Sequence, residues 1–148
     1  MSKPKRKDRL VKELMDLKGR VALITGGTGH IGFVMCEALA EMGASIAVLD
    51  LDEGSCKKAA TRLSTDHGIK AIPLAVDLGN EALVKSVPQA VVQDLGGLDI
   101  LVNCAALVGT SSLKGWTSPF LEQESEPWRK ALEINLTAPF ILTQAAAP

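Results

Sequence analysis

The chain has 148 residues, of which 47% are hydrophobic and 22% charged, and its formal net charge at pH 7 is −1. This length and composition are typical of one globular domain with a buried core, and they exclude an intrinsically disordered chain. No apolar run reaches the roughly 20 residues of a transmembrane helix and no secretory signal is present, so we expect a cytoplasmic protein without a membrane partner.

The N-terminal segment is basic: residues 1–20 hold eight Lys or Arg and three acidic residues, a net charge of +5. The run KPKRK at residues 3–7 raises nucleic acid or an anionic membrane surface as a partner. No aromatic residue is interleaved with these cations, so we expect a solvated arm over residues 1–16 and no nucleic-acid partner. Residues 17–148 would form the folded domain.

Apolar and amphipathic runs alternate along this folded part. Strands are expected over Arg20–Thr25, Ser45–Asp50, Lys70–Val76 and Leu98–Asn103. Helices are expected over Ile31–Met42, Gly54–Asp66, Glu81–Leu95 and, after Ser125 with Pro127 in the first turn, through Ala146. This alternation predicts an α/β fold with a doubly wound parallel sheet in the order 3-2-1-4, and a ligand at the switch point between strands 1 and 4. The long irregular segment 105–125 is expected to be a functional or a mobile loop.

A glycine-rich turn joins the first strand to the first helix. Its glycines permit unusual backbone dihedrals and close approach of a phosphate, while the helix N-terminus offers backbone N–H groups and the positive end of the helix dipole. The turn therefore predicts a Rossmann-type dinucleotide site that holds a pyrophosphate. The residues expected to contact the cofactor here are Gly26, Thr28, Gly29, His30, Ile31 and Gly32.

Asp50 ends the second strand, 18 positions after Gly32. An acid about 20 residues beyond the glycines accepts hydrogen bonds from the adenosine ribose hydroxyls. Its charge, together with that of Asp52, repels a 2′-phosphate, and no Lys or Arg follows until Lys57. We therefore expect NAD as the cofactor in preference to NADP. The alternative is that Asp50 merely caps the next helix.

Two further polar residues follow successive strands. Asp77 comes after the third strand and Asn103 after the fourth, where the carboxyl ends of strands meet a ligand. Either one alone would be read as a turn or cap residue, but their order after neighbouring strands indicates a shared site.

Cysteine and histidine are sparse. Cys36, Cys56 and Cys104 form no CxxC pair, and His30 and His67 are the only histidines. We expect reduced thiols, no disulfide framework and no metal site.

From about Leu17 through Ala146 the chain resembles the short-chain dehydrogenase/reductase family. LKGRVALITGG is similar to the family's first strand and turn, and NCAA at residues 103–106 to its NNAG segment. The resemblance implies that Asp50 binds the ribose, that Asp77 and Leu78 contact adenine, and that Asn103, Ala105 and Ala106 line the cofactor cleft. Leu51, next to Asp50, is also expected to contact the cofactor. It also implies that Asn135, in EINLTAPF, is catalytic and holds a water in the proton relay.

Two departures from the family pattern bear on function. The glycine spacing TGxxGxxG, with His30 where the compact branch has Gly, is that of the extended branch acting on nucleotide sugars, whereas GGLDILVNCAA and WRKALEINLTAPF resemble the compact branch. The family's Ser and Tyr-x-x-x-Lys follow a fifth strand, but this sequence holds no Tyr and ends at Pro148. We therefore expect a catalytically incomplete chain, the first part of a longer dehydrogenase.

The predicted function is that of an NAD-dependent oxidoreductase interconverting a small-molecule alcohol and a carbonyl, with this chain as its cofactor-binding part. The alternatives are a non-catalytic NAD-binding module and a fragment of an extended-type nucleotide-sugar epimerase or dehydratase. A homo-oligomer is expected through the last helix, whose apolar residues would serve equally well as internal core. These residues are Leu132, Leu136, Phe140 and Ile141.

Overall fold

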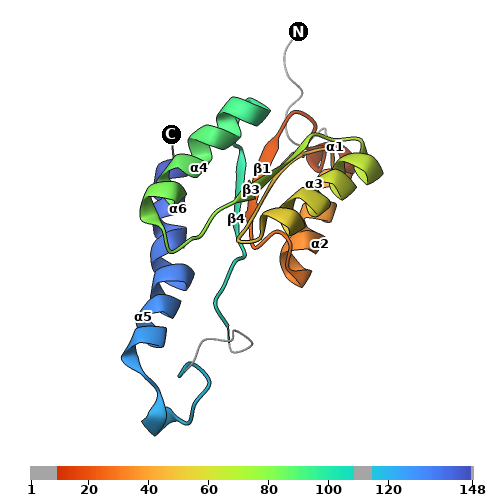
Figure 1. Ribbon diagram of the computed structural model, residues 1–148. Helices are drawn as coiled ribbons and strands as arrows, with labels where there is room; N and C mark the ends of the chain where they lie inside the picture. The colour runs from red at the N-terminus through yellow and green to blue at the C-terminus, as the bar shows by residue number, and fades with distance from the viewer. Residues whose placement is uncertain (1–9, 109–114, 148) are drawn as a thin grey trace.

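A parallel four-stranded sheet with helices on both faces forms the centre of the molecule (Figure 1). It is seen in a computed structural model that describes residues 10–108 and 115–147. The strands are β1 (Val21–Thr25), β2 (Ser45–Asp50), β3 (Ala71–Ala75) and β4 (Ile100–Asn103). Their order is β3-β2-β1-β4, and all three pairings are parallel. The predicted fold class and strand order are confirmed.

The helices follow the strands closely in the predicted pattern. They are α1 (Val11–Leu14), α2 (His30–Glu41), α3 (Glu53–His67), α4 (Glu81–Leu95), α5 (Ser125–Leu132) and α6 (Ala138–Ala146), with a 3₁₀ turn at Phe120–Glu122. Short α1 lies inside the predicted solvated arm, of which residues 1–9 are outside the described part. The single helix expected after Ser125 is interrupted by a π-helical segment, Glu133–Thr137, which separates α5 from α6.

Caps determine where α3 and α4 begin and end. The Asp52 carboxylate accepts from Ser55 N at 2.7 Å at the start of α3, and the Asn80 side chain accepts from Leu83 N at 3.2 Å at the start of α4. Gly68 and Gly96 end these helices in the left-handed conformation. The cap of α3 is thus Asp52 and not Asp50, so the helix-cap interpretation of Asp50 does not apply.

Two apolar layers enclose the sheet. One packs α2 and α3 on Ala22, Ile24, Ile46 and Val48, and the other packs α4 and α6 on Leu23, Ala47 and Leu49. β1 and β2 are consequently buried on both faces, which explains their continuous apolar sequences. The central strands place their carboxyl ends at one rigid edge, and the glycine turn leaves from this edge.

The last helical run contributes to both core and surface. Ile141 and Leu142 of α6 are buried in the second layer, whereas Leu132, Leu136 and Phe140 are exposed. Ile141 therefore does not belong to the predicted apolar surface, and oligomerisation through the other three residues stays a prediction. Among the described helices, none combines the length and apolar composition needed to cross a membrane.

Candidate functional site

The turn after β1 is shaped by glycines that tolerate no side chain. Gly26 has φ +66°, and a Cβ there would lie 2.8 Å from Ala105 Cα in the segment after β4. A Cβ on Gly32 would lie 2.0 Å from Gly26 O, so α2 packs directly on the turn. Any larger residue at either position would separate the turn from β4 or from α2.

The start of α2 leaves backbone donors available for an anion. The first N–H groups of a helix have no intrahelical acceptor, and the N-cap here is Gly29, which has no side chain to accept from them. The first turn holds no acidic residue that would repel a phosphate. This helix start therefore fits the pyrophosphate of a dinucleotide. Gly29, His30 and Ile31 are exposed here and Gly32 is buried.

The carboxylate of Asp50 is tied to the glycine turn. Its Oδ2 accepts from Thr28 N at 3.0 Å and from Thr28 Oγ1 at 2.5 Å, and its Oδ1 accepts from Leu51 N at 2.8 Å. The turn is further joined to β2 by the bond from Gly27 N to Leu49 O, at 3.1 Å. Asp50 is thus a half-buried acid in a fixed orientation, at the place where the ribose-binding acid is expected.

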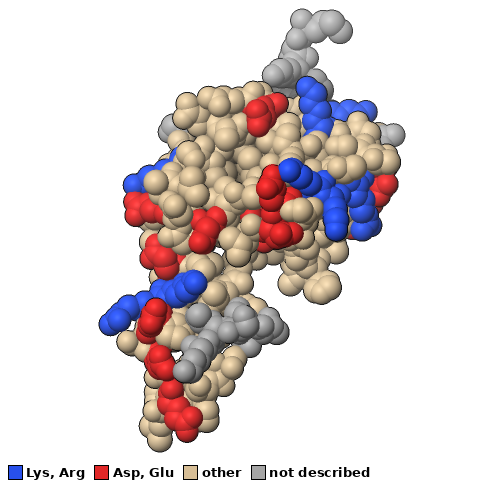
Figure 2. Space-filling model, viewed as in Figure 1, with Lys and Arg blue, Asp and Glu red and all other residues tan. Residues whose placement is uncertain are grey.

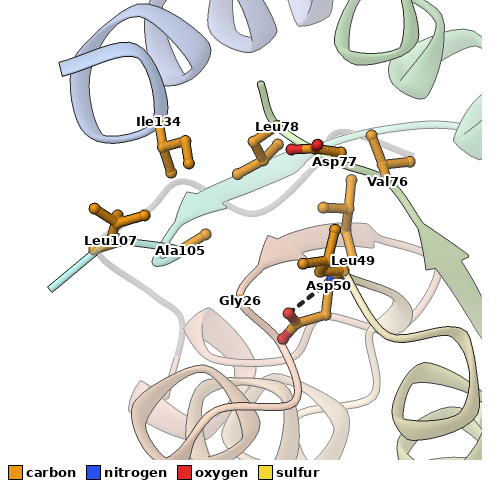
Figure 3. A pocket seen from close by; sticks show the side chains of 11 residues that line it. Gly26, Leu49, Asp50, Val76, Asp77, Leu78, Ala105, Leu107 and Ile134 are labelled. Atoms are coloured by element: carbon orange, nitrogen blue, oxygen red, sulfur yellow. Dashed lines mark hydrogen bonds between the residues drawn. The ribbon is translucent and has the colours of Figure 1, made fainter. Parts of the chain in front are cut away.

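A pocket of about 180 Å³ lies beside Asp50, between the ends of the strands (Figure 3). Figure 3 shows Asp50 and Leu49 on one side, Val76, Asp77 and Leu78 on another, and Ala105, Leu107 and Ile134 at the far end. It therefore brings together the predicted residues Gly26, Asp50, Leu51, Asp77, Leu78, Ala105 and Ala106. Leu49, Val76, Leu107 and Ile134 also line it, and nothing in their sequence pattern singled them out.

Asp77 is both a pocket residue and a turn residue. Its Oδ1 accepts from Gly79 N at 2.9 Å, and its carbonyl oxygen accepts from Asn80 N at 2.9 Å. These bonds form the turn that leads into α4 and fix where Leu78 lies at the pocket wall. The turn interpretation and the site interpretation of Asp77 are therefore both compatible with its geometry.

Thr25 links the turn to the end of β4, a role the sequence reasoning missed. It is 2% exposed, and its Oγ1 accepts from Cys104 N at 3.0 Å and Ala105 N at 3.1 Å. Thr25 pairs with Asn103 in the β1–β4 register. A polar residue at the end of an otherwise apolar strand was the available signal.

The two predicted asparagines hold the last helical run against β4 and do not line the pocket. Asn103 Nδ2 donates to Thr143 Oγ1 at 3.3 Å. Asn135, inside the π-helical segment, accepts from Leu107 N at 2.7 Å through Oδ1 and donates to Leu107 O at 3.0 Å through Nδ2. Both ends of its amide are thus committed to the backbone of the segment after β4.

A second, more open groove lies between α2 and α3, on the Thr28 side of Asp50. Thr28, Gly29 and His30 line it together with Lys58 and Arg62 of α3. Arg62 pairs with Glu37 at 2.7 Å and stacks over Phe33. Figure 2 shows Lys and Arg gathered over α3 with acidic side chains beside them. Within residues 10–108 and 115–147, no group of three or more His, Cys, Asp or Glu is arranged to hold a metal.

Several groups have shifted pKa values, three of them (Cys36, Cys56 and Asp52) close to the site and one, Asp99, at the opposite end of the sheet. Burial raises the pKa of the Cys36 thiol, beneath the glycine turn, to about 12, and burial also raises the pKa of the Cys56 thiol. The Ser55 cap bonds hold the pKa of Asp52 below its usual value. Asp99 precedes β4, and its pKa is lowered by the Val21 N–H and by Arg20.

The parallel sheet in the order β3-β2-β1-β4, with a glycine turn after β1 and an acid at the end of β2, is a fold of the Rossmann type. The short chain dehydrogenase family profile matches residues 20–148, and the chain belongs to this family of oxidoreductases. It is 36% identical over 132 residues to a short chain dehydrogenase of Pseudocercospora fijiensis, covering 89% of this chain and 41% of that protein.

Solved structures agree on the fold. An NAD⁺-bound xylitol dehydrogenase superposes with a TM-score of 0.78 at 31% identity, covering 88% of this chain and 47% of that one. L-sorbose reductase from Gluconobacter frateurii, complexed with NADPH and L-sorbose, superposes with a TM-score of 0.78 at 30% identity, covering 89% and 48%. The chain spans about half the length of the curated relatives it matches.

Proposed function

We propose that this chain binds NAD and forms the cofactor-binding part of an oxidoreductase that interconverts an alcohol and a carbonyl. The observation that carries the proposal is the half-buried carboxylate of Asp50, held at the junction of the glycine turn and the pocket. A carboxylate there accepts hydrogen bonds from ribose hydroxyls and repels a 2′-phosphate.

The described residues divide naturally among the parts of a dinucleotide. The start of α2 would hold the pyrophosphate and Asp50 with Leu51 the adenosine ribose. Asp77 and Leu78 would border the adenine. Ala105 and Ala106, with the wall that includes Ile134, would border the nicotinamide. When bound, the nicotinamide supplies the hydride-transfer chemistry, and this apolar wall excludes water from it.

The proposal assigns cofactor binding, and not proton transfer, to these 148 residues. The resemblance places the acid–base step on a Tyr, and the sequence holds none. Asn135 would act by fixing the segment at the far end of the pocket, because both ends of its amide are bonded to Leu107. The family's water-holding role would then fall to backbone groups of the π-helical segment.

A second candidate, NADP, is favoured by the groove between α2 and α3. Lys58 and Arg62 line this groove together with Thr28, which bonds Asp50. Arg62 is neutralised by Glu37 and Asp66, which leaves Lys58 as the cation of the groove most able to meet a 2′-phosphate. The sequence alone did not reveal that Lys58 lines a groove together with Thr28.

The experiment is a titration of the folded chain with NADH and, separately, NADPH, followed by nicotinamide fluorescence. The proposal predicts saturable NADH binding that is tighter than NADPH binding. Lys58→Ala would weaken NADPH binding only if the second candidate is right, and Lys85→Ala on α4 is the matched control. Failure of the folded chain to bind either dinucleotide would refute the proposal.

A further inference from the structure

The Thr28–Asp50 contact is a cross-element bond within the proposed cofactor site. Thr28 belongs to the turn after β1, whereas Asp50 is the last residue of β2. The two side chains meet because β1 and β2 pair in parallel, with Thr25 opposite Leu49, so that the turn after β1 lies beside Asp50 at the end of β2. Both the backbone N–H and the hydroxyl of Thr28 donate to the same oxygen, Oδ2.

These bonds limit how many further hydrogen bonds the Asp50 carboxylate can accept from a ligand. A carboxylate accepts about four hydrogen bonds, and the bonds from Thr28 and Leu51 N already use three of them. Three donors from two directions also fix the rotation of the Asp50 side chain. A ribose therefore meets an acid that is already oriented, and little side-chain entropy remains to be lost on binding.

The Thr28 hydroxyl has two opposite effects on a bound ribose. It orients the Asp50 carboxylate, which strengthens ribose binding, and it occupies an acceptor site on that carboxylate, which weakens ribose binding. Orientation is favoured here, because charge-assisted bonds are the stronger kind and the hydroxyl lies at only 2.5 Å from Oδ2. A carboxylate held at the ribose also keeps its negative charge in the position that repels a 2′-phosphate.

We propose that Thr28 is a positioning residue that orients Asp50 and thereby sets the preference of this chain for NAD over NADP. The inference rests on the proposed function. Thr28 acts through Asp50, so removing its hydroxyl changes the ratio of NADH to NADPH affinity only while the carboxylate is present.

The test uses Thr28→Val, which is isosteric and keeps the backbone N–H but loses the hydroxyl. NADH affinity is expected to fall about three- to tenfold, with a smaller change for NADPH. Thr28→Ser keeps the hydroxyl and is expected to restore most of the NADH affinity. Thr65→Val, which loses a hydroxyl bond from an exposed position of α3 to Thr61 O, controls for the loss of any threonine hydrogen bond.

A double-mutant cycle separates positioning from a purely structural contribution. In an Asp50→Ala background, Thr28→Val is expected to change NADH affinity less than twofold, because no carboxylate remains to be oriented. Thermal unfolding checks that each variant folds. If Thr28→Val does not fold, Thr28→Ala repeats the test.

The outcomes distinguish this inference from the proposed function. A wild-type chain that binds neither dinucleotide refutes the proposed function and this inference with it. A wild-type chain that binds NADH, combined with an unchanged NADH to NADPH ratio in Thr28→Val, refutes only the role of Thr28. The same holds for tighter NADH binding by Thr28→Val, or for equal effects of this variant with and without Asp50.

Discussion

The side-chain amide of Asn135 pairs with both backbone polar atoms of Leu107, accepting from its N–H at 2.7 Å and donating to its carbonyl oxygen at 3.0 Å. One end of this pair lies in a π-helical segment and the other in the pocket wall. The helical run that packs against α4 is thereby connected to the segment that leaves β4. The helix irregularity and the pocket wall are consequently a single structural unit.

Replacing Asn135 by Ala would leave both Leu107 groups without this partner. We expect a loss of about 1–3 kcal/mol in the free energy of unfolding, because two hydrogen bonds are lost and each contributes about 0.5–1.5 kcal/mol. Urea denaturation measures it, with Gln144→Ala on α6 as the control. NADH affinity would fall as well, because the far wall of the pocket is no longer held. An unchanged stability would mean that the amide pair is dispensable.

Thr25→Val would retain the shape of the buried side chain but remove its acceptor. Cys104 N and Ala105 N would then lose their shared partner, at a cost of about 1–3 kcal/mol in unfolding free energy. Thr25→Ser keeps the hydroxyl and should cost clearly less. Denaturation curves of the two variants, compared with wild type, test this. Equal losses for Val and Ser would assign the effect to packing.

Cys36 should be chemically inert in the folded chain. Burial raises its pKa to about 12, and only the thiolate reacts with iodoacetamide. At pH 8 we expect labelling of the half-buried Cys104 well before Cys36, as read by peptide mass spectrometry, and labelling of both in urea. Because the pKa of Cys36 is raised in the folded state, the protonated thiol contributes to the free energy of unfolding in full below the ordinary thiol pKa of 9.0. This contribution is lost as the pH rises towards 12. Prompt labelling of Cys36 in the native chain would contradict this.

Asp99 should stabilise the start of β1 in a pH-dependent way. Its Oδ2 accepts from Val21 N at 2.9 Å, and this bond and Arg20 lower its pKa. Because the folded pKa is depressed, the stabilisation is present above the ordinary pKa and is lost as pH falls through the folded value. The Tm of Asp99→Asn should therefore lie below wild type at pH 7 and approach it in acid. A difference in Tm between wild type and Asp99→Asn that stays constant from pH 7 into acid would show that the charge of Asp99 does not contribute to stability.

The elements with local signals were predictable. α4 (Glu81–Leu95) and β2 (Ser45–Asp50) both have their predicted bounds, because the amphipathic run of α4 and the uninterrupted apolar run of β2 are local patterns. The π-helical segment was not predicted, because Asn135 within it bonds Leu107, which lies 28 positions away along the chain. Tertiary pairing of this kind leaves no periodic signature in the sequence.

Parts of the site escaped prediction for the same reason. Thr25 contacts the segment after β4 only because β1 and β4 pair, and Lys58 lies near Thr28 only because α3 packs beside α2. Asp50, by contrast, was identifiable because strand end and glycine turn are both local patterns. Sequence reasoning therefore predicted the strand-end residues Asp50 and Asp77 that line the pocket, whereas Asn103 lies outside it, and it missed the contacts between the elements.

The most direct test of the account is a calorimetric titration of wild type and Asp50→Ala with NADH and NADPH. We predict that wild type binds NADH more tightly than NADPH, and that Asp50→Ala weakens NADH binding about tenfold or more while narrowing the difference between the two cofactors, since both the acceptor and the repelling charge are lost. Asp94→Ala, on α4 away from the pocket, is the matched control. If Asp50→Ala folds and keeps both the NADH affinity and the cofactor preference of wild type, Asp50 does not bind the ribose and the central claim is wrong.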